Sequence, residues 1–156
     1  MTQPEIGRLI GLARTLHARV VTIGHGRRAE SRATATAFAR AWQSDGGEIL
    51  DVVDWPATAA SWLRPARRLV AGGPDAWVVA DTPQAWAQVA RRLRRSTDWD
   101  PARTLGAASL DDARVIELAG APAVQGMAGA TADGGTWRVR GGLLVRDRAD
   151  RRVCAR

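Results

Sequence analysis

The stretch Arg19-Val-Val-Thr-Ile-Gly-His-Gly26 begins the repeating pattern from which the fold of this chain can be predicted. Its first five residues are rich in β-branched side chains, which predicts a short buried strand, and Gly24-His25-Gly26 predicts a tight turn after it. Residues 4–16 before this stretch and residues 30–44 after it carry apolar side chains at three- and four-residue spacing. That spacing predicts an amphipathic helix on each side of the strand.

A second strand and helix follow. Residues 48–55 predict a strand that ends in Asp54 and Trp55, and residues 58–71 predict a helix. Because Pro65 lies inside this helix, it should kink or divide it.

The third unit has the clearest boundary. Residues 75–80 form an apolar strand, and Asp81-Thr82-Pro83 predicts a helix start, since a capping side chain precedes a proline. Residues 103–109 then predict a fourth strand, and residues 110–118 a short helix or a further turn. Strands and helices that alternate in this way favour a parallel sheet with right-handed crossovers.

The last part of the chain has a different character. Residues 121–156 are rich in glycine, and residues 136–140 and 143–146 predict the two strands of a β-hairpin. We therefore expect a single α/β domain over residues 1–156. It should be a three-layer sandwich with a mainly parallel sheet of four or more strands and a C-terminal β-hairpin.

Composition excludes several functions. All 23 basic residues are arginine and the net charge is +7, but the arginines are spread along the 156 residues, so nucleic-acid binding is not expected. Cys154 has no partner for a disulfide, and no cluster of ligand residues predicts a metal site. No run of 18 apolar residues predicts a membrane span. The first residues do not resemble a signal peptide, so a complete chain would be cytoplasmic.

Chemistry is hard to assign from the residue pattern. Gly24-x-Gly26-x-x-Ala29 follows a strand and precedes a helix, and Asp54 lies on the next strand, as in dinucleotide-binding sites. A structural turn explains the same glycines. His25 lacks the partners of a catalytic or metal-binding histidine, and no serine has a nucleophile motif. We therefore expect no catalytic residue and no cofactor, with nucleotide binding through Gly24, Gly26 and Asp54 as an alternative.

Tryptophan is abundant, with seven residues. Trp42, Trp62, Trp77 and Trp86 fall at positions that should face the core. Trp55 and Trp99 fall at element ends, where burial in the core is the default and an aromatic wall for a ligand is the alternative.

Several segments resemble a known family. They are Ala18-Arg-Val-Val-Thr-Ile-Gly24, the run Ala37-Phe-Ala-Arg-Ala-Trp-Gln-Ser-Asp-Gly-Gly-Glu-Ile49 and the run Pro74-Asp-Ala-Trp-Val-Val-Ala-Asp-Thr-Pro-Gln-Ala85. Together with the helix before them, they resemble the C-terminal lobe of the type I periplasmic-binding-protein-like fold. The glycine-rich run at residues 124–145 resembles the tail of LppC/LpoA-type penicillin-binding-protein activators.

The resemblance implies a non-catalytic binding protein of the periplasm or the outer membrane. It suggests regulation of cell-wall synthesis through a protein partner such as a peptidoglycan synthase. The alternative is a lobe that binds an amino acid or another small solute for an ABC transporter. Family members have two lobes, whereas this chain has one and is shorter between residues 109 and 126, so a homodimer that rebuilds the cleft is a further alternative.

Candidate site residues follow from the expected topology. Ligands and partners of such sheets dock at the carboxyl ends of the parallel strands. The side chains that fall there are His25, Arg27, Trp55, Asp81, Thr82 and Ser109.

Overall fold

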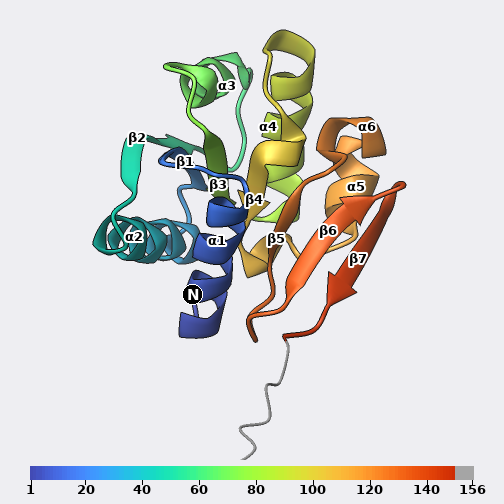
Figure 1. Ribbon diagram of the computed structural model, residues 1–156. Coiled ribbons are helices and arrows are strands. Elements are labelled where there is room, and N and C mark those ends of the chain that lie inside the picture. The colour runs from blue at the N-terminus through green and yellow to red at the C-terminus, as the bar shows by residue number, and fades with distance from the viewer. Residues whose placement is uncertain (150–156) are drawn as a thin grey trace, which may run out of the picture.

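The computed structural model describes residues 1–149, and Cys154 lies outside this part of the chain. One sheet of seven strands runs through it in the order β2-β1-β3-β4-β5-β6-β7 (Figure 1). The five strands from β2 to β5 in this order are parallel, and β6 and β7 are antiparallel to their neighbours. The strands are β1 Val20–Gly26, β2 Glu48–Trp55, β3 Ala76–Ala80, β4 Thr104–Gly106, β5 Ala128–Ala130, β6 Thr136–Arg140 and β7 Leu143–Asp147.

Helices cover both faces of this sheet, which confirms the α/β three-layer prediction (Figure 1). On one face, Leu9 and Trp42 of the first two helices pack in one buried cluster with Ile23 of β1. On the other face, Trp86 and Leu93 belong to a second cluster that includes side chains of the remaining helices. The helices are α1 Gln3–Thr15, α2 Ala29–Ser44, α3 Leu63–Val70, α4 Pro83–Ser96, α5 Arg114–Ala119 and α6 Ala121–Val124, with 3-10 turns η1 Pro101–Arg103 and η2 Ala108–Leu110.

The predicted turn at Gly24-His25-Gly26 is wrong, because these residues continue β1. His25 pairs with Asp54 of β2 on one side and with Ala80 of β3 on the other. The parallel strands on either side of β1 offer hydrogen-bond partners to this segment, so the strand ends only at Gly26.

The predicted helix over residues 58–71 is also shorter than expected. It begins at Leu63, and Pro65 is its third residue. The first backbone N–H groups of a helix have no partner within the helix, so a proline there removes no hydrogen bond. Pro65 therefore lies in the first turn and divides nothing.

Two differences concern the second half of the chain. The fourth strand ends at Gly106, and Ser109 lies in η2 instead of in the strand. The glycine-rich segment contains α6 and β5 in addition to the expected hairpin of β6 and β7. Neither has an alternating pattern long enough to be predicted, since β5 is Ala-Gly-Ala.

The tryptophans mostly build the core. Trp55 and Trp99 are buried, so the default expectation for both is confirmed. Trp62 is half-buried and packs against the larger cluster, so it faces the core as expected without being fully buried. Within residues 1–149, no helix is long and apolar enough to cross a membrane.

Candidate functional site

Asp81 joins the carboxyl ends of two strands. It directly follows β3, and its carboxylate accepts a hydrogen bond from the indole N–H of Trp55, the last residue of β2, at 2.6 Å. Its other oxygen accepts the backbone N–H of Thr82 at 2.7 Å. The side chain is almost fully buried. Asp81 therefore ties β2 to β3 across the end of β1, which lies between them.

The burial of the Asp81 carboxylate disfavours its ionised form. Burial raises the pKa of Asp81, although the Trp55 indole and the Thr82 amide both favour the ionised form. A charge kept out of water costs folding free energy unless its partners compensate for it. Titratable groups with a raised pKa next to a surface pocket are typical of functional sites.

The glycines of β1 make room for this arrangement. A Cβ at Gly24 would lie 2.7 Å from the Trp55 ring, and a Cβ at Gly26 would collide with the Asp81 carboxylate. Both glycines lie inside the strand, so packing of Trp55 and Asp81 accounts for them, and they do not form the loop that a dinucleotide motif requires. The third residue of that alternative, Asp54, is exposed and pairs with Arg27 at 3.2 Å.

His25 is buried. Its Nδ1 lies 2.8 Å from the backbone oxygen of Gly26, to which a protonated Nδ1 donates. This contact fixes the ring against its own strand. His25 lines neither of the two surface pockets at the strand ends.

Two surface pockets open at the strand ends, and Arg27 lines both. The first, of about 360 Å³, lies between the ends of β1 and β2 and the start of α3, and Asp54, Ser61 and Arg64 also line it. The second, of about 290 Å³, is lined by Arg28, Asp81 and Gln84 among others. Volumes of this order suit a small molecule. Arg27 is exposed, and its Nε pairs with Asp54 beside the first pocket.

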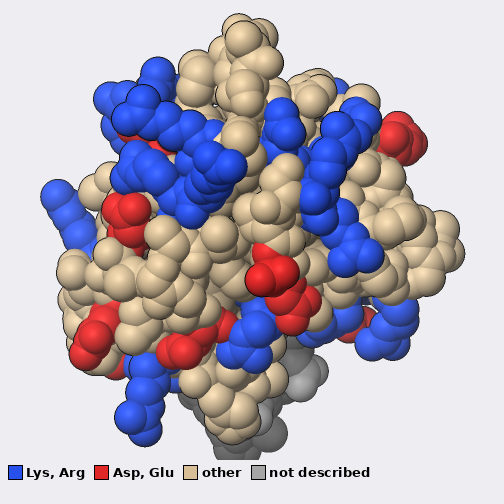
Figure 2. Space-filling view, turned by 90° about the horizontal axis from the view of Figure 1, so that it is seen from above, with Lys and Arg blue, Asp and Glu red and all other residues tan. Residues whose placement is uncertain are grey.

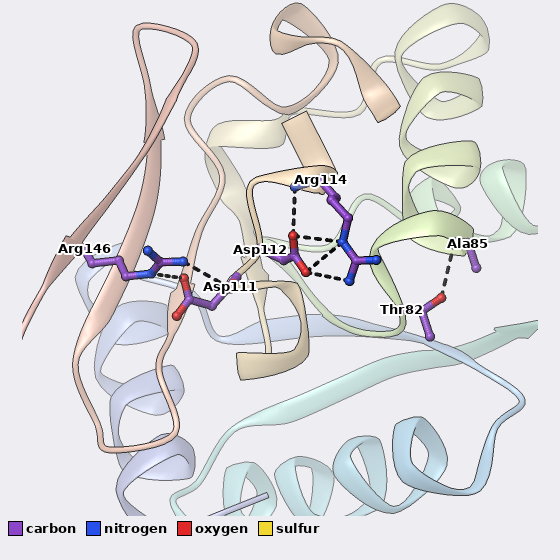
Figure 3. A network of polar contacts seen from close by, with 6 residues as sticks. All are labelled: Thr82, Ala85, Asp111, Asp112, Arg114 and Arg146. Atoms are coloured by element: carbon purple, nitrogen blue, oxygen red, sulfur yellow. Dashed lines mark hydrogen bonds and ion pairs between the residues drawn. The ribbon is translucent and has the colours of Figure 1, made fainter. Parts of the chain in front are cut away.

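Thr82 lines the second pocket and also caps a helix. Its hydroxyl accepts the Ala85 N–H at 3.4 Å and caps α4 (Figure 3). At the start of α2 the corresponding cap position is Arg28, which makes no such side-chain bond. The positive ends of both helices therefore face the pocket floor.

Ser109 stands apart from this group. It lies in η2 after β4 and lines neither of the two pockets. The loop that follows it is fastened by ion pairs, because Asp111 accepts Arg146 Nε of β7 at 2.6 Å and Asp112 accepts Arg114 (Figure 3). The Arg114 guanidinium lowers the pKa of Asp112. The structure thus brings together four of the six predicted residues at the two pockets, namely Arg27, Trp55, Asp81 and Thr82, whereas His25 and Ser109 line neither.

Sequence reasoning missed Arg28, Arg64 and Gln84. Arg28 and Gln84 come within four residues of a strand end, so the same rule that selected Arg27 and Thr82 could have included them. Arg64 reaches the first pocket from α3, and no pattern in the sequence indicates that. Among residues 1–149, no group of three or more histidine, cysteine or acidic side chains could hold a metal ion.

The family follows from comparison with known proteins. A family model described as periplasmic binding protein matches residues 3–139. The chain belongs to the periplasmic binding protein family. This agrees with the type I binding-protein resemblance of the sequence, whereas the narrower resemblance to LppC/LpoA-type activators has no such match. A search of curated proteins gives no match to this chain.

Solved structures share the fold of this periplasmic binding protein. A substrate-binding periplasmic protein from Ralstonia solanacearum superposes with a TM-score of 0.70 at 22% identity, over 81% of this chain and 35% of its own. A branched-chain amino acid ABC transporter periplasmic ligand-binding protein from Burkholderia xenovorans gives 0.69 at 16% identity, over 82% and 34%. A branched-chain amino acid transporter substrate binding protein from Streptococcus pneumoniae, in complex with isoleucine, gives 0.69 at 16%, over 82% and 35%. The chain thus spans about a third of the length of these structures.

Proposed function

We propose that this chain is a solute-binding lobe that holds a small carboxylate-bearing solute, such as an amino acid, at the carboxyl ends of β1, β2 and β3. The observation that carries the proposal is the pair of pockets that meet at Arg27 above the buried Asp81. An ABC transporter is the system that such a lobe would serve, in the periplasm. The lobe binds its solute and does not transform it.

The residues divide into a floor and a set of contacts. Asp81 has both oxygens occupied by Trp55 and Thr82, so it shapes the floor and has little capacity left for a ligand. Arg27 and Arg28 are exposed at the rim, and a guanidinium can bind a carboxylate through two parallel hydrogen bonds. We therefore assign the carboxylate of the solute to these arginines.

The other hypotheses of the sequence have less support. Regulation of a peptidoglycan synthase by protein contact rested on the glycine-rich tail, and no contact of that tail favours it. Nucleotide binding rested on Gly24 and Gly26, which packing against Trp55 and Asp81 explains. Small-solute binding is supported by the family and by the position of the pockets.

Calorimetric titration of the chain tests the proposal. The panel contains isoleucine, glutamate, succinate and, for the nucleotide alternative, NAD. We expect saturable binding of at least one carboxylate solute and an affinity loss of about tenfold or more in Arg27→Gln, since hydrogen bonds to charged groups contribute about 1.5–3 kcal/mol. The matched control is Arg32→Gln, which removes an exposed arginine from α2 outside both pockets. Equal losses in both variants, or no saturable binding, would contradict the proposal.

A further inference from the structure

An arginine-rich face extends over α3 and α4, and two of its arginines, Arg64 and Arg68, also line the first strand-end pocket. Neither helix contains an acidic residue. Within residues 1–149, Arg68 is the one arginine of this set with an ion pair, to Asp51 at 3.2 Å. The set, which we call the arginine face, is Arg64, Arg67, Arg68, Arg91, Arg92, Arg94 and Arg95.

Folding alone does not explain this concentration of charge. The buried side of α4 consists of apolar side chains such as Trp86 and Leu93, so its arginines contribute little to the core. Arginines in a last helical turn interact favourably with the helix dipole, which accounts for those near the ends of α3 and α4. Arg64 and Arg91 lie outside those last turns, and like charges this close destabilise the fold. An external anionic partner would compensate for the repulsion.

The two helices present these arginines together. Arg67 of α3 and Ser96 of α4 line one pocket with Trp77, at the start of β3. Trp62, half-buried before α3, lines another with Arg91 and Arg95 of α4. Figure 2 looks onto the end of the molecule where α3 and the last turns of α4 lie, and it shows arginine side chains gathered in two groups, with carboxylates at several other places on this face. The charge therefore covers a broad surface and does not follow a single line.

We propose that the arginine face docks on the anionic phospholipid headgroups of a bilayer. A broad face formed by two helices matches a planar array of phosphates, which guanidinium groups bind well. Trp62 adds a half-buried indole among the arginines, and tryptophan is favoured at the headgroup level of membranes. The periplasmic location suggested by the family places a bilayer, and not nucleic acid, beside this surface.

Such docking leaves the strand-end site accessible. The pocket shared by Arg67 and Ser96 lies at the start of β3, beside Trp77, whereas Asp81 follows the end of the same strand. That part of the arginine face and Asp81 are thus at opposite ends of β3, and no arginine of the face lines the second strand-end pocket. A lobe held on a membrane by its arginine face can still exchange solute at the second pocket.

Vesicle co-sedimentation tests this proposal. The chain is mixed with vesicles of equal parts phosphatidylglycerol and phosphatidylcholine, and separately with vesicles of phosphatidylcholine alone. We expect binding to the anionic vesicles that weakens with added salt, and none to the neutral ones. The variant Arg67→Gln/Arg91→Gln/Arg94→Gln/Arg95→Gln should bind at least about tenfold more weakly, since each arginine near an anionic surface contributes on the order of 1 kcal/mol.

The control removes the same charge elsewhere. Arg32, Arg40, Arg138 and Arg140 are exposed on α2 and β6, and their replacement by Gln should leave most of the vesicle binding in place. Equal loss in the two quadruple variants would overturn the proposal, because it would show an effect of net charge only. So would an absence of binding to anionic vesicles, or equally tight, equally variant-sensitive binding to duplex DNA. Solute binding measured by calorimetry is independent of these outcomes.

Discussion

Each end of β3 carries an aspartate, and the surroundings shift the pKa values of the two side chains in opposite directions. Before the strand, Asp75 accepts the backbone N–H groups of Arg19 and Val20, both at 2.9 Å, and these bonds lower its pKa. After the strand, burial raises the pKa of Asp81. The first carboxylate stabilises the fold through its charge, whereas the charge of the second costs stability. The difference indicates that the end of the strand, and not its start, is shaped by something other than folding.

The largest expected effect comes from removing the partner of Asp81. Trp55→Ala should lower the free energy of unfolding by about 3–5 kcal/mol, because it empties a large fully buried site and leaves a buried carboxylate oxygen without a donor. Chemical denaturation measures this. Trp62→Ala is the matched control, and its half-buried ring should matter much less. Equal losses of unfolding free energy in the two variants would contradict the special role of the Trp55–Asp81 contact at the end of β3.

The second prediction concerns Asp81 and pH. The folded-state pKa of Asp81 is raised above the ordinary value of 3.8. The wild-type carboxyl therefore stabilises the fold most below pH 3.8, and this stabilisation is lost as the pH rises through the folded-state pKa. The stability of Asp81→Asn relative to wild type should therefore increase between about pH 4 and pH 7. Thermal unfolding at several pH values checks the sign. A relative stability that falls over this range would mean that the charge of Asp81 is favourable.

Asp75→Asn should show the opposite slope. Its folded-state pKa is lowered, so the wild-type carboxylate stabilises the fold above 3.8 and loses this effect as pH falls through the folded-state pKa. The deficit of the variant should be full at neutral pH and shrink in acid. Because Asp75 is partly exposed, the change should be modest. Parallel pH slopes for the two variants would show that the two ends of β3 do not differ.

The smallest effect should come from the arginine face. Replacing Arg94 and Arg95 with Gln should change stability by no more than about 0.5 kcal/mol each, since both are exposed and make no ion pair within residues 1–149. Urea unfolding midpoints provide the measurement. A loss of several kcal/mol would mean that these arginines support the fold and are not free for a partner.

The sequence predicted the longer strands well, and the ends of some elements and the shortest elements less well. Strands such as β2 and the hairpin of β6 and β7 were predicted nearly to the residue, because alternating and helical apolar spacing persists over each element. The extension of β1 to Gly26 was missed because glycine signals a turn locally, whereas the two neighbouring strands provide its partners. The segment β5 is too short and too poor in side chains to carry a pattern.

The candidate site was predictable in position and not in chemistry. Parallel topology alone places Arg27 and Thr82 together at the strand ends. That Trp55 donates to Asp81, and that Gly26 leaves space for this carboxylate, depends on the register between strands distant in sequence. The contribution of Arg64 depends on where α3 begins, which Pro65 obscured.

Solute binding at the carboxyl ends of β1 to β3 is tested most directly by its location. Isotope-labelled chain is titrated with the solute that calorimetry identifies, and the backbone amide signals are followed by NMR. We predict saturable shifts centred on Arg27, Arg28 and Thr82, with signals of Arg67, Arg94 and Arg95 on the arginine face unchanged. Saturable shifts confined to residues away from the strand ends would contradict the assignment of this site.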